Sequence, residues 1–186
     1  MIANRFRPLI VLVALVWSVE VVNLFLGHRL VSFGIFPRSF TGLIGIPISP
    51  LLHAGIWHTV SNTVPLLILG SLTLAGGKRI FWETTIGVTL LSGLLVWIFA
   101  RAAYHVGASG LVFGYFGAIL ARAVIERSMT AIAIAIVTLM TYGGLIWGVF
   151  PLRSYASFES HLFGLIAGLA VVGLTHKLRG SQTPLR

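Results

Sequence analysis

Four polar side chains that could carry out acyl-transfer chemistry stand near the starts of hydrophobic segments. Ser109 lies in the stretch GASG, His161 opens the stretch HLFGLIAG, and His58 precedes Asn62 by four residues. A serine hydroxyl is a weak nucleophile that needs an adjacent base, and acyl transfer also needs donors aimed at the developing oxyanion. The residue types therefore suit a Ser109–His161 dyad. His58, the Asn62 amide and backbone N–H groups at a helix N-terminus would be the donors.

Helical spacing gives these side chains a way to meet. His58 and Asn62 are four residues apart, so they share one helix face. Small residues let helices pack closely, and glycines recur at helical spacing in two segments, Gly110 with Gly114 and Gly164 with Gly168. If these glycines join the two segments, the base arrives beside the nucleophile. Each residue alone also has a structural explanation, because a serine between glycines suits helix packing and a histidine at a helix end suits the membrane interface.

Hydrophobic segments of membrane-spanning length must position these side chains. Of 186 residues, 57% are hydrophobic and 9% are charged, whereas a soluble domain has about 25% charged residues. About 20 apolar residues cross a bilayer core, and in lipid each segment must satisfy its own backbone, so the segments are predicted to be helices. Six are predicted: Leu9–Gly27, Leu52–Ala75, Ile80–Ala100, Val106–Ile125, Met129–Phe150 and Phe158–Thr175.

The basic residues predict the orientation of six alternating spans. Nine would lie on one side: Arg5, Arg7, Lys78, Arg79, Arg122, Arg127, Lys177, Arg179 and Arg186. Four would lie on the other: Arg29, Arg38, Arg101 and Arg153. The excess predicts that both termini are cytoplasmic. His58, Ser109 and His161 then share one depth, within about two helical turns of the outer face. The net charge of +9 does not indicate nucleic-acid binding, because no soluble face gathers the basic residues.

One membrane domain is predicted, without an internal repeat. Residues 1–8 form a cytoplasmic N-terminal segment, residues 9–177 the six-helix domain, and residues 178–186 a cytoplasmic tail. Residues 28–51 are apolar but broken by glycine and proline, which places this long loop partly in the membrane interface. It is either a linker lying on the membrane or a structured loop that props the bundle open or guides a ligand.

The residues that are missing exclude several classes of enzyme. Cysteine and aspartate are both absent, which removes thiolate metal sites, cysteine nucleophiles, intramembrane aspartyl proteases and any Ser-His-Asp triad. The His-Glu-x-x-His stretch of zinc proteases is absent too. Glu20 and Glu159 are the carboxylates considered for orienting the base. Glu159 is expected to point away from His161, two residues further along the same helix, whereas Glu20 could face the bundle interior.

The sequence resembles the rhomboid family of intramembrane serine proteases in three motifs. HAGIWHTVSN matches H-x-x-x-x-H-x-x-x-N, with His53, His58 and Asn62 at the named positions. The nucleophile motif G-x-S-G is matched at Gly107, Ser109 and Gly110. The motif H-x-x-G-x-x-x-G is matched at His161, Gly164 and Gly168. A lone G-x-S-G is weak in a chain with 21 glycines, but three motifs in order on alternate helices are specific. The resemblance covers nearly the whole chain.

The resemblance implies a six-helix all-α membrane protein and a role for each matched residue. Ser109 would be the nucleophile and His161 the general base, with His58 and Asn62 stabilising the oxyanion. Supporting positions would be His53, Gly107, Gly110, Phe113, Gly164 and Gly168. The implied reaction is hydrolysis of a peptide bond in or near a transmembrane segment of a membrane-protein substrate, close to the outer face. It implies no cofactor, metal or nucleic acid, and a bacterial plasma membrane as the location, and it leaves the oligomeric state open.

The chain departs from the family at three places, one of which is the frequent Gly-x-x-x-Glu-x-x-x-Gly pattern, where Leu74 stands four residues after Gly70. Family members often have a tyrosine four residues after the serine, stacked on the histidine, and here the residue is Phe113. A phenylalanine ring can still pack on His161. The Trp-Arg pair that many members carry in the first loop is absent, and FPRS supplies only Arg38.

Three other functions are weighed against the protease. A zinc-dependent membrane hydrolase would use His53, His58, His105 and His161, but carboxylate partners are scarce. A non-proteolytic rhomboid-like protein would bind or escort membrane proteins, although such relatives usually lose the serine or the histidine. A transporter would place its polar residues near the midplane, whereas here they cluster near one surface.

Overall fold

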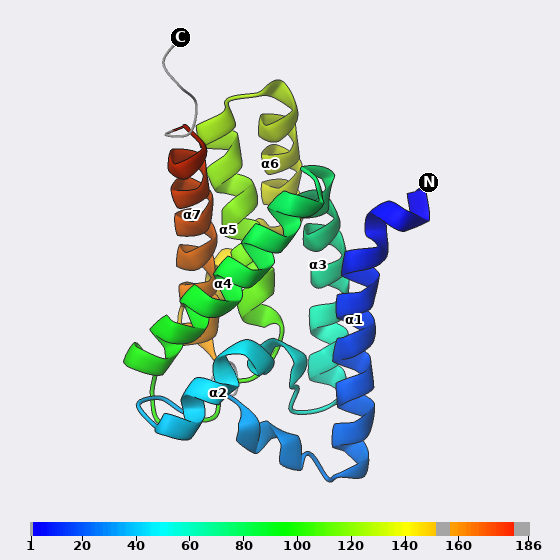
Figure 1. The fold of residues 1–186 in the computed structure, drawn as a ribbon, viewed down its shortest axis with the longest axis vertical. Coiled ribbons are helices and arrows are strands. Elements are labelled where there is room, and N and C mark those ends of the chain that lie inside the picture. The colour runs from blue at the N-terminus through cyan, green and yellow to red at the C-terminus, as the bar shows by residue number, and fades with distance from the viewer. Residues whose placement is uncertain (1, 152–156, 181–186) are drawn as a thin grey trace.

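The computed structural model describes residues 2–151 and 157–180 and is built from helices (Figure 1). The longer helices are α1 (Ile2–Phe25), α3 (Ile56–Ala75), α4 (Lys78–Phe99), α5 (Ser109–Glu126), α6 (Met129–Tyr142) and α7 (Phe158–Gly180). Shorter helices are η1 (Arg29–Phe33), α2 (Phe40–Ile48), η2 (Ser49–Leu51) and η3 (Gly143–Val149). The predicted all-α fold is confirmed for these residues.

The predicted hydrophobic segments are all helical, with corrections at their ends. Five helices of the described chain are long and apolar enough to cross a membrane, and a sixth span results if α2–η2 and α3, which meet at a bend of 67°, count as one. Leu52–Gly55 precedes α3, so His53 is outside the helix that was expected to contain it. Similarly, Val106–Ala108 form a loop because Gly107, with a φ of +115°, breaks the helical backbone just before Ser109.

The chain ends of the bundle also differ from the predicted domain boundaries. Residues 2–8, expected as a separate N-terminal segment, already belong to α1, and α7 continues past residue 177 to Gly180. The remainder of the predicted tail, residues 181–186, and Arg153 lie outside the described residues. α1 begins and α7 ends at the same end of the bundle, whereas α2 lies at the opposite end (Figure 1). Which end faces the cytoplasm stays a prediction.

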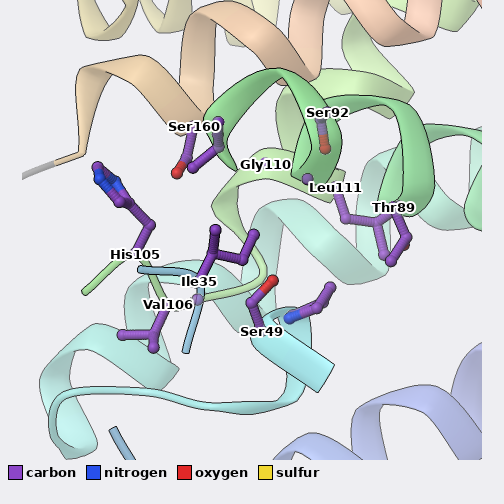
Figure 2. Close-up of a pocket in the computed structure, with 13 residues that line it drawn as sticks. Ile35, Ser49, Thr89, Ser92, His105, Val106, Gly110, Leu111 and Ser160 are labelled. Atoms are coloured by element: carbon purple, nitrogen blue, oxygen red, sulfur yellow. The ribbon is translucent and has the colours of Figure 1, made fainter. Parts of the chain in front are cut away.

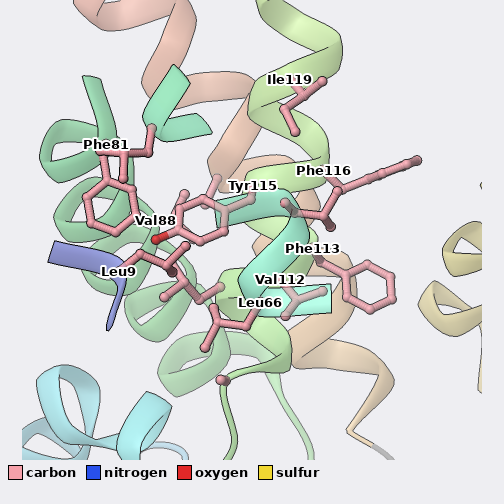
Figure 3. Packing of buried hydrophobic residues seen from close by; sticks show 14 of the residues in the cluster. Leu9, Leu66, Phe81, Val88, Val112, Phe113, Tyr115, Phe116 and Ile119 are labelled. Atoms are coloured by element: carbon pink, nitrogen blue, oxygen red, sulfur yellow. The ribbon is translucent and has the colours of Figure 1, made fainter. Parts of the chain in front are cut away.

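Helix α5 occupies the centre of the molecule and packs against α3, α4, α6 and α7. It contributes more buried residues to the main hydrophobic cluster than any other helix, and the cluster also includes Leu9 from α1, Leu66 from α3 and Phe81 from α4 (Figure 3). Tyr115 is fully buried there, and its hydroxyl lies 2.7 Å from Thr85 Oγ1 on α4, which gives this polar atom a partner. A helix held on all sides provides a fixed support for Ser109 at its first position.

The long loop between α1 and α3 is folded onto the end of α4. Arg38 donates from Nη1 to the carbonyl oxygens of Ile98 and Ala100 at 3.0 and 2.9 Å, which satisfies acceptors at the C-terminus of α4. The indole N–H of Trp97 on α4 donates to the carbonyl of Ser39 in the loop at 2.7 Å. These contacts support the interpretation of residues 28–51 as a structured loop. Arg38 and Trp97, from different segments, anchor it without the adjacent Trp-Arg pair.

Candidate active site

The close approach of α5 and α7 brings two of the three motifs together. A Cβ added at Gly164 would collide with the Gly110 carbonyl, and one added at Gly168 would collide with the Gly114 carbonyl. The two backbones are therefore in direct contact along this line, as the glycine spacing predicted. Ser109 is the first residue of α5 and His161 the fourth of α7, so both stand at the same end of this contact.

The imidazole of His161 is held against the same face of α5 that carries Ser109. Phe113, one turn after Ser109, stacks on it with ring centroids 4.3 Å apart and planes 4° apart. Nδ1 of His161 lies 2.8 Å from the carbonyl oxygen of Gly148 in η3. Because a carbonyl can only accept, Nδ1 carries the proton and Nε2 keeps its lone pair. The phenylalanine thus packs on the histidine as expected from the sequence.

The loop before Ser109 is fixed by backbone hydrogen bonds. The Ala108 N–H donates to Nε2 of the buried His53 at 3.2 Å, and the Gly107 N–H donates to the Ser49 carbonyl at 2.9 Å. The amide groups of Ser109 and Gly110 belong to the first turn of α5, where a helix offers no internal acceptor. The positive end of the α5 dipole lies at the same place. This turn is suited to stabilising negative charge beside the Ser109 hydroxyl.

His58 and Asn62 of α3 lie beside this turn. A Cβ at Gly107 would stand 2.8 Å from both Cε1 and Nε2 of His58 and 3.7 Å from the Asn62 amide nitrogen. The Ala54 N–H reaches Nδ1 of His58 at 3.5 Å, which leaves the proton of the neutral ring on Nε2. The Asn62 amide gives one hydrogen to the His58 carbonyl at 3.0 Å and keeps the other. Both side chains therefore direct a free donor toward the loop before Ser109.

Glu20 and Asn23 are buried residues of α1 that contact the first loop and the segment before α3. Asn23 is fully buried, donates to the His53 carbonyl at 2.8 Å and accepts from the Leu30 N–H at 3.0 Å, so it ties the first loop to the segment before α3. Glu20 is 1% exposed and lies 3.4 Å from the Asn23 amide and 3.9 Å from His28 Nδ1. Glu20 faces the bundle interior, as considered from the sequence, but it contacts these groups and makes no hydrogen bond to His161.

Glu159 and His105 belong to a second polar group at the start of α7. The Glu159 carboxylate pairs with the Arg101 guanidinium at 3.5 Å and makes no hydrogen bond to His161 among the described residues. His105 is 2% exposed, with Nδ1 2.6 Å from Ser157 Oγ and Nε2 3.1 Å from the Arg101 carbonyl. Burial lowers the pKa of His105 from its usual 6.5, against the opposing effects of the Arg101 carbonyl and Glu159. Ser157 also accepts from the Ser160 N–H and thereby caps α7.

The histidines of the zinc alternative do not form a metal site in the described residues, although the rings of His53 and His58 lie only 5.0 Å apart. The part of the chain that the structure describes contains no group of three or more His, Cys, Asp or Glu side chains that could hold a metal ion. His105 is bonded to Ser157 and Arg101, His53 to the Ala108 amide, and His161 to the Gly148 carbonyl. This geometry gives a zinc-dependent hydrolase no site among the described residues.

A small cavity adjoins the nucleophile loop on the side of α4. Its volume is about 20 Å³, and a cavity of roughly 10–15 Å³ or more on this measure can hold a water molecule. Hydroxyl-bearing residues line it together with Gly107 and Gly110: Ser49, Thr89, Ser92 and Ser160 (Figure 2). These hydroxyl groups offer partners to an ordered water, while apolar side chains such as Ile35 and Val96 line the rest of the cavity.

Sequence reasoning missed the residues that act through backbone atoms or from α1. Gly148 contributes a carbonyl and Ser49 another, and a carbonyl has no residue type by which a motif could reveal it. Asn23 could have been noticed as a polar residue inside a hydrophobic segment, which is a default functional candidate in a membrane.

Comparison with known proteins gives matches over most of the chain. The family profile described as Rhomboid domain matches residues 39–178. An uncharacterized protein of Mycobacterium tuberculosis is 38% identical over 172 residues, which cover 87% of this chain and 71% of that protein. An uncharacterized protein of Mycobacterium leprae is 34% identical over 171 residues, covering 87% and 67%. A Bacillus subtilis protein named "Putative rhomboid protease YdcA" is 29% identical over 122 residues, covering 63% and 60%.

Proposed function

Because the chain belongs to the rhomboid family of multi-pass membrane proteins, we propose that it is an intramembrane serine endopeptidase with a Ser109–His161 dyad. The observation that carries the proposal is the position of the His161 ring. It is stacked on Phe113, one turn from Ser109, with its protonated nitrogen turned to Gly148 and its lone pair therefore on Nε2. A histidine with a free lone pair, on a helix packed against the one that begins at Ser109, supports its role as the general base for this hydroxyl.

The chemistry follows the two half-reactions of acyl transfer. His161 Nε2 takes the Ser109 hydroxyl proton while Oγ forms a bond to the scissile carbonyl carbon. The tetrahedral intermediate then expels the amine, which leaves with the proton from Nε2, and an acyl-serine remains. A water molecule gives its proton to Nε2 and attacks this ester, and the carboxylic acid leaves as the proton returns to Ser109 Oγ.

Negative charge on the substrate oxygen would be stabilised by donors from two segments. His58 Nε2–H and the free hydrogen of the Asn62 amide come from α3. The N–H groups of the first turn of α5 add further donors, with the helix dipole behind them. These groups are already fixed by bonds to Ala54 and to the His58 carbonyl, and fixed donors stabilise a developing charge without reorganising.

The substrate would be a membrane protein cleaved within or beside a transmembrane segment, near the outer face. A regular helix hides its scissile carbonyls in internal hydrogen bonds. Segments that contain glycine, proline or polar residues open more easily and are the expected targets. His58, Ser109 and His161 all lie within the first turn of their helices, which supports cleavage close to one membrane surface.

Labelling of the intact protein with a fluorophosphonate tests the nucleophile directly. The parent protein is expected to be labelled, and Ser109→Ala is expected to lose the label while keeping its thermal unfolding midpoint. His161→Ala should lose both labelling and cleavage of a transmembrane test substrate. Labelling of Ser109→Ala at the parent level, or cleavage by either variant at the parent rate, would refute the dyad. Activity lost on chelation and restored by zinc would support the metal-dependent alternative instead.

A further inference from the structure

The proposed base has a hydrogen-bond partner that no side chain provides. In serine hydrolases a carboxylate commonly orients the histidine, but this chain has no aspartate and four glutamates. Glu83 and Glu126 bond to arginines one turn away, at Arg79 and Arg122. Glu20 and Glu159 are engaged with other groups as described above. Among the described residues, therefore, the His161 ring makes its only hydrogen bond by donating from Nδ1 to the backbone carbonyl of Gly148.

The carbonyl and the Phe113 ring together fix the imidazole in position and in tautomer. Phe113 covers one face of the ring, and the Gly148 oxygen lies at its Nδ1 edge, 2.8 Å away. A side chain at position 148 would not fit beside them, because its Cβ would stand 2.7 Å from Phe113 Cζ and 3.2 Å from His161 Nδ1. Position 148 therefore has to be glycine for the carbonyl to approach the ring this closely.

We propose that Gly148 is the positioning residue of this dyad, with its carbonyl taking the place of the missing carboxylate. The proposal rests on the proposed function. By accepting from Nδ1–H, the carbonyl keeps the lone pair on Nε2 in the free enzyme and stabilises the imidazolium while it holds the serine proton. Because the acceptor is a neutral carbonyl and not a carboxylate, the orientation of the His161 ring depends on a single hydrogen bond to the backbone.

A pair of alanine variants separates this role from a general effect on η3. Gly148→Ala places a methyl group against Phe113 and His161, whereas Gly144→Ala, in the same 3-10 helix, has nothing within 4 Å of the added Cβ. We expect Gly148→Ala to lower the rate constant of fluorophosphonate labelling about tenfold, the change that corresponds to one hydrogen bond to the base. Gly144→Ala is expected to label at the parent rate. Gly144→Ala should keep the parent unfolding midpoint, whereas the added methyl group of Gly148→Ala should lower it, so labelling is compared at a temperature where both proteins are folded.

A backbone substitution tests the carbonyl without adding atoms. An ester in place of the amide between Gly148 and Val149, introduced with the corresponding α-hydroxy acid, makes the Gly148 carbonyl a weaker acceptor. The matched control is an ester between Gly144 and Leu145. In ¹⁵N-histidine spectra, with His161 assigned by comparison with His161→Gln, we expect Nδ1–H in the parent and a mixture of tautomers in the Gly148 ester. The Gly148 ester should also label more slowly than its control.

The outcomes distinguish this inference from the proposed function. If the parent protein does not label at all, the dyad itself is refuted. If the parent labels but the Gly148 ester labels at the rate of its control, the dyad stands and the role of Gly148 is overturned. A parent spectrum in which Nδ1 of His161 is unprotonated would overturn it as well.

Discussion

At the scale of single residues, each functional histidine uses one ring nitrogen in a hydrogen bond and keeps the other for the proposed reaction. Nδ1 of His161 is bonded and Nε2 is left with a lone pair, while Nδ1 of His58 is bonded and Nε2 is left with a proton. The hydrogen bond at Nδ1 therefore gives Nε2 of the two histidines opposite properties. One is suited to accept a proton and the other to donate a hydrogen bond.

Asn62 offers the sharpest residue-scale test of the oxyanion donors. Asn62→Ala is expected to lower kcat for a transmembrane substrate, by less than the roughly 10²–10³-fold that loss of an oxyanion donor typically costs, because His58 and the α5 amides remain. Ser61→Ala, one residue away on the exposed side of α3, is the control and should keep the parent kcat. A parent-like kcat in Asn62→Ala would remove this side chain from the mechanism.

His105 predicts a dependence of stability on acid. Its pKa is lowered in the folded protein, so below about pH 6.5 the unfolded chain binds the proton more readily and folding is weakened as the pH falls. The groups that face the ring are Ser157, Arg101 and Glu159. Going from neutral to mildly acidic buffer, the unfolding midpoint of the parent should fall further than that of His105→Gln, which cannot titrate. Equal shifts of the unfolding midpoint in the two proteins would show that His105 does not cause this pH dependence.

At the scale of elements, the contact between α5 and α7 decides where the nucleophile and the base stand. Gly168→Ala adds a methyl group that meets the Gly114 carbonyl and lies 2.9 Å from the Ala118 nitrogen. Overpacking of this kind costs about 1–3 kcal/mol. We therefore expect a lower thermal midpoint and slower labelling of Ser109. The control is Gly173→Ala in the same helix, where nothing lies within 4 Å and stability should be kept or slightly raised. Similar midpoints in the two variants would mean that the helices are not in tight contact.

The sequence was sufficient to predict the helices, their order and the glycine contact, because hydrophobic length and glycine spacing depend on local residue types. It could not predict how the helices begin. Leu52–Gly55 and Val106–Ala108 adjoin hydrophobic segments without a proline to mark the boundary, and the extended backbone of Leu52 and the positive φ of Gly55 and Gly107 appear only in the structure. Gly148 was missed for a different reason. Its contribution is a carbonyl oxygen, which all residues possess, so only tertiary structure identifies it.

At the scale of the whole molecule, the absence of cysteine makes the orientation directly testable. Single cysteines can be placed at Lys78, the first residue of α4, and at the half-exposed Tyr104, before α5. If the basic side is cytoplasmic, a membrane-impermeant maleimide should label Tyr104→Cys in intact cells and Lys78→Cys only after permeabilisation. The cysteine-free parent is the blank. The reverse pattern would place the termini outside and the active site at the inner face.

The distribution of the site along the chain has a consequence for biosynthesis. The ribosome makes Ser109 well before Gly148 and His161, and α7, which carries His161, follows the other described helices. A partly made chain therefore holds the hydroxyl group without the imidazole that would activate it. If the protein is the protease proposed here, it cannot attack neighbouring polypeptides in the insertion machinery until α7 has entered the bilayer.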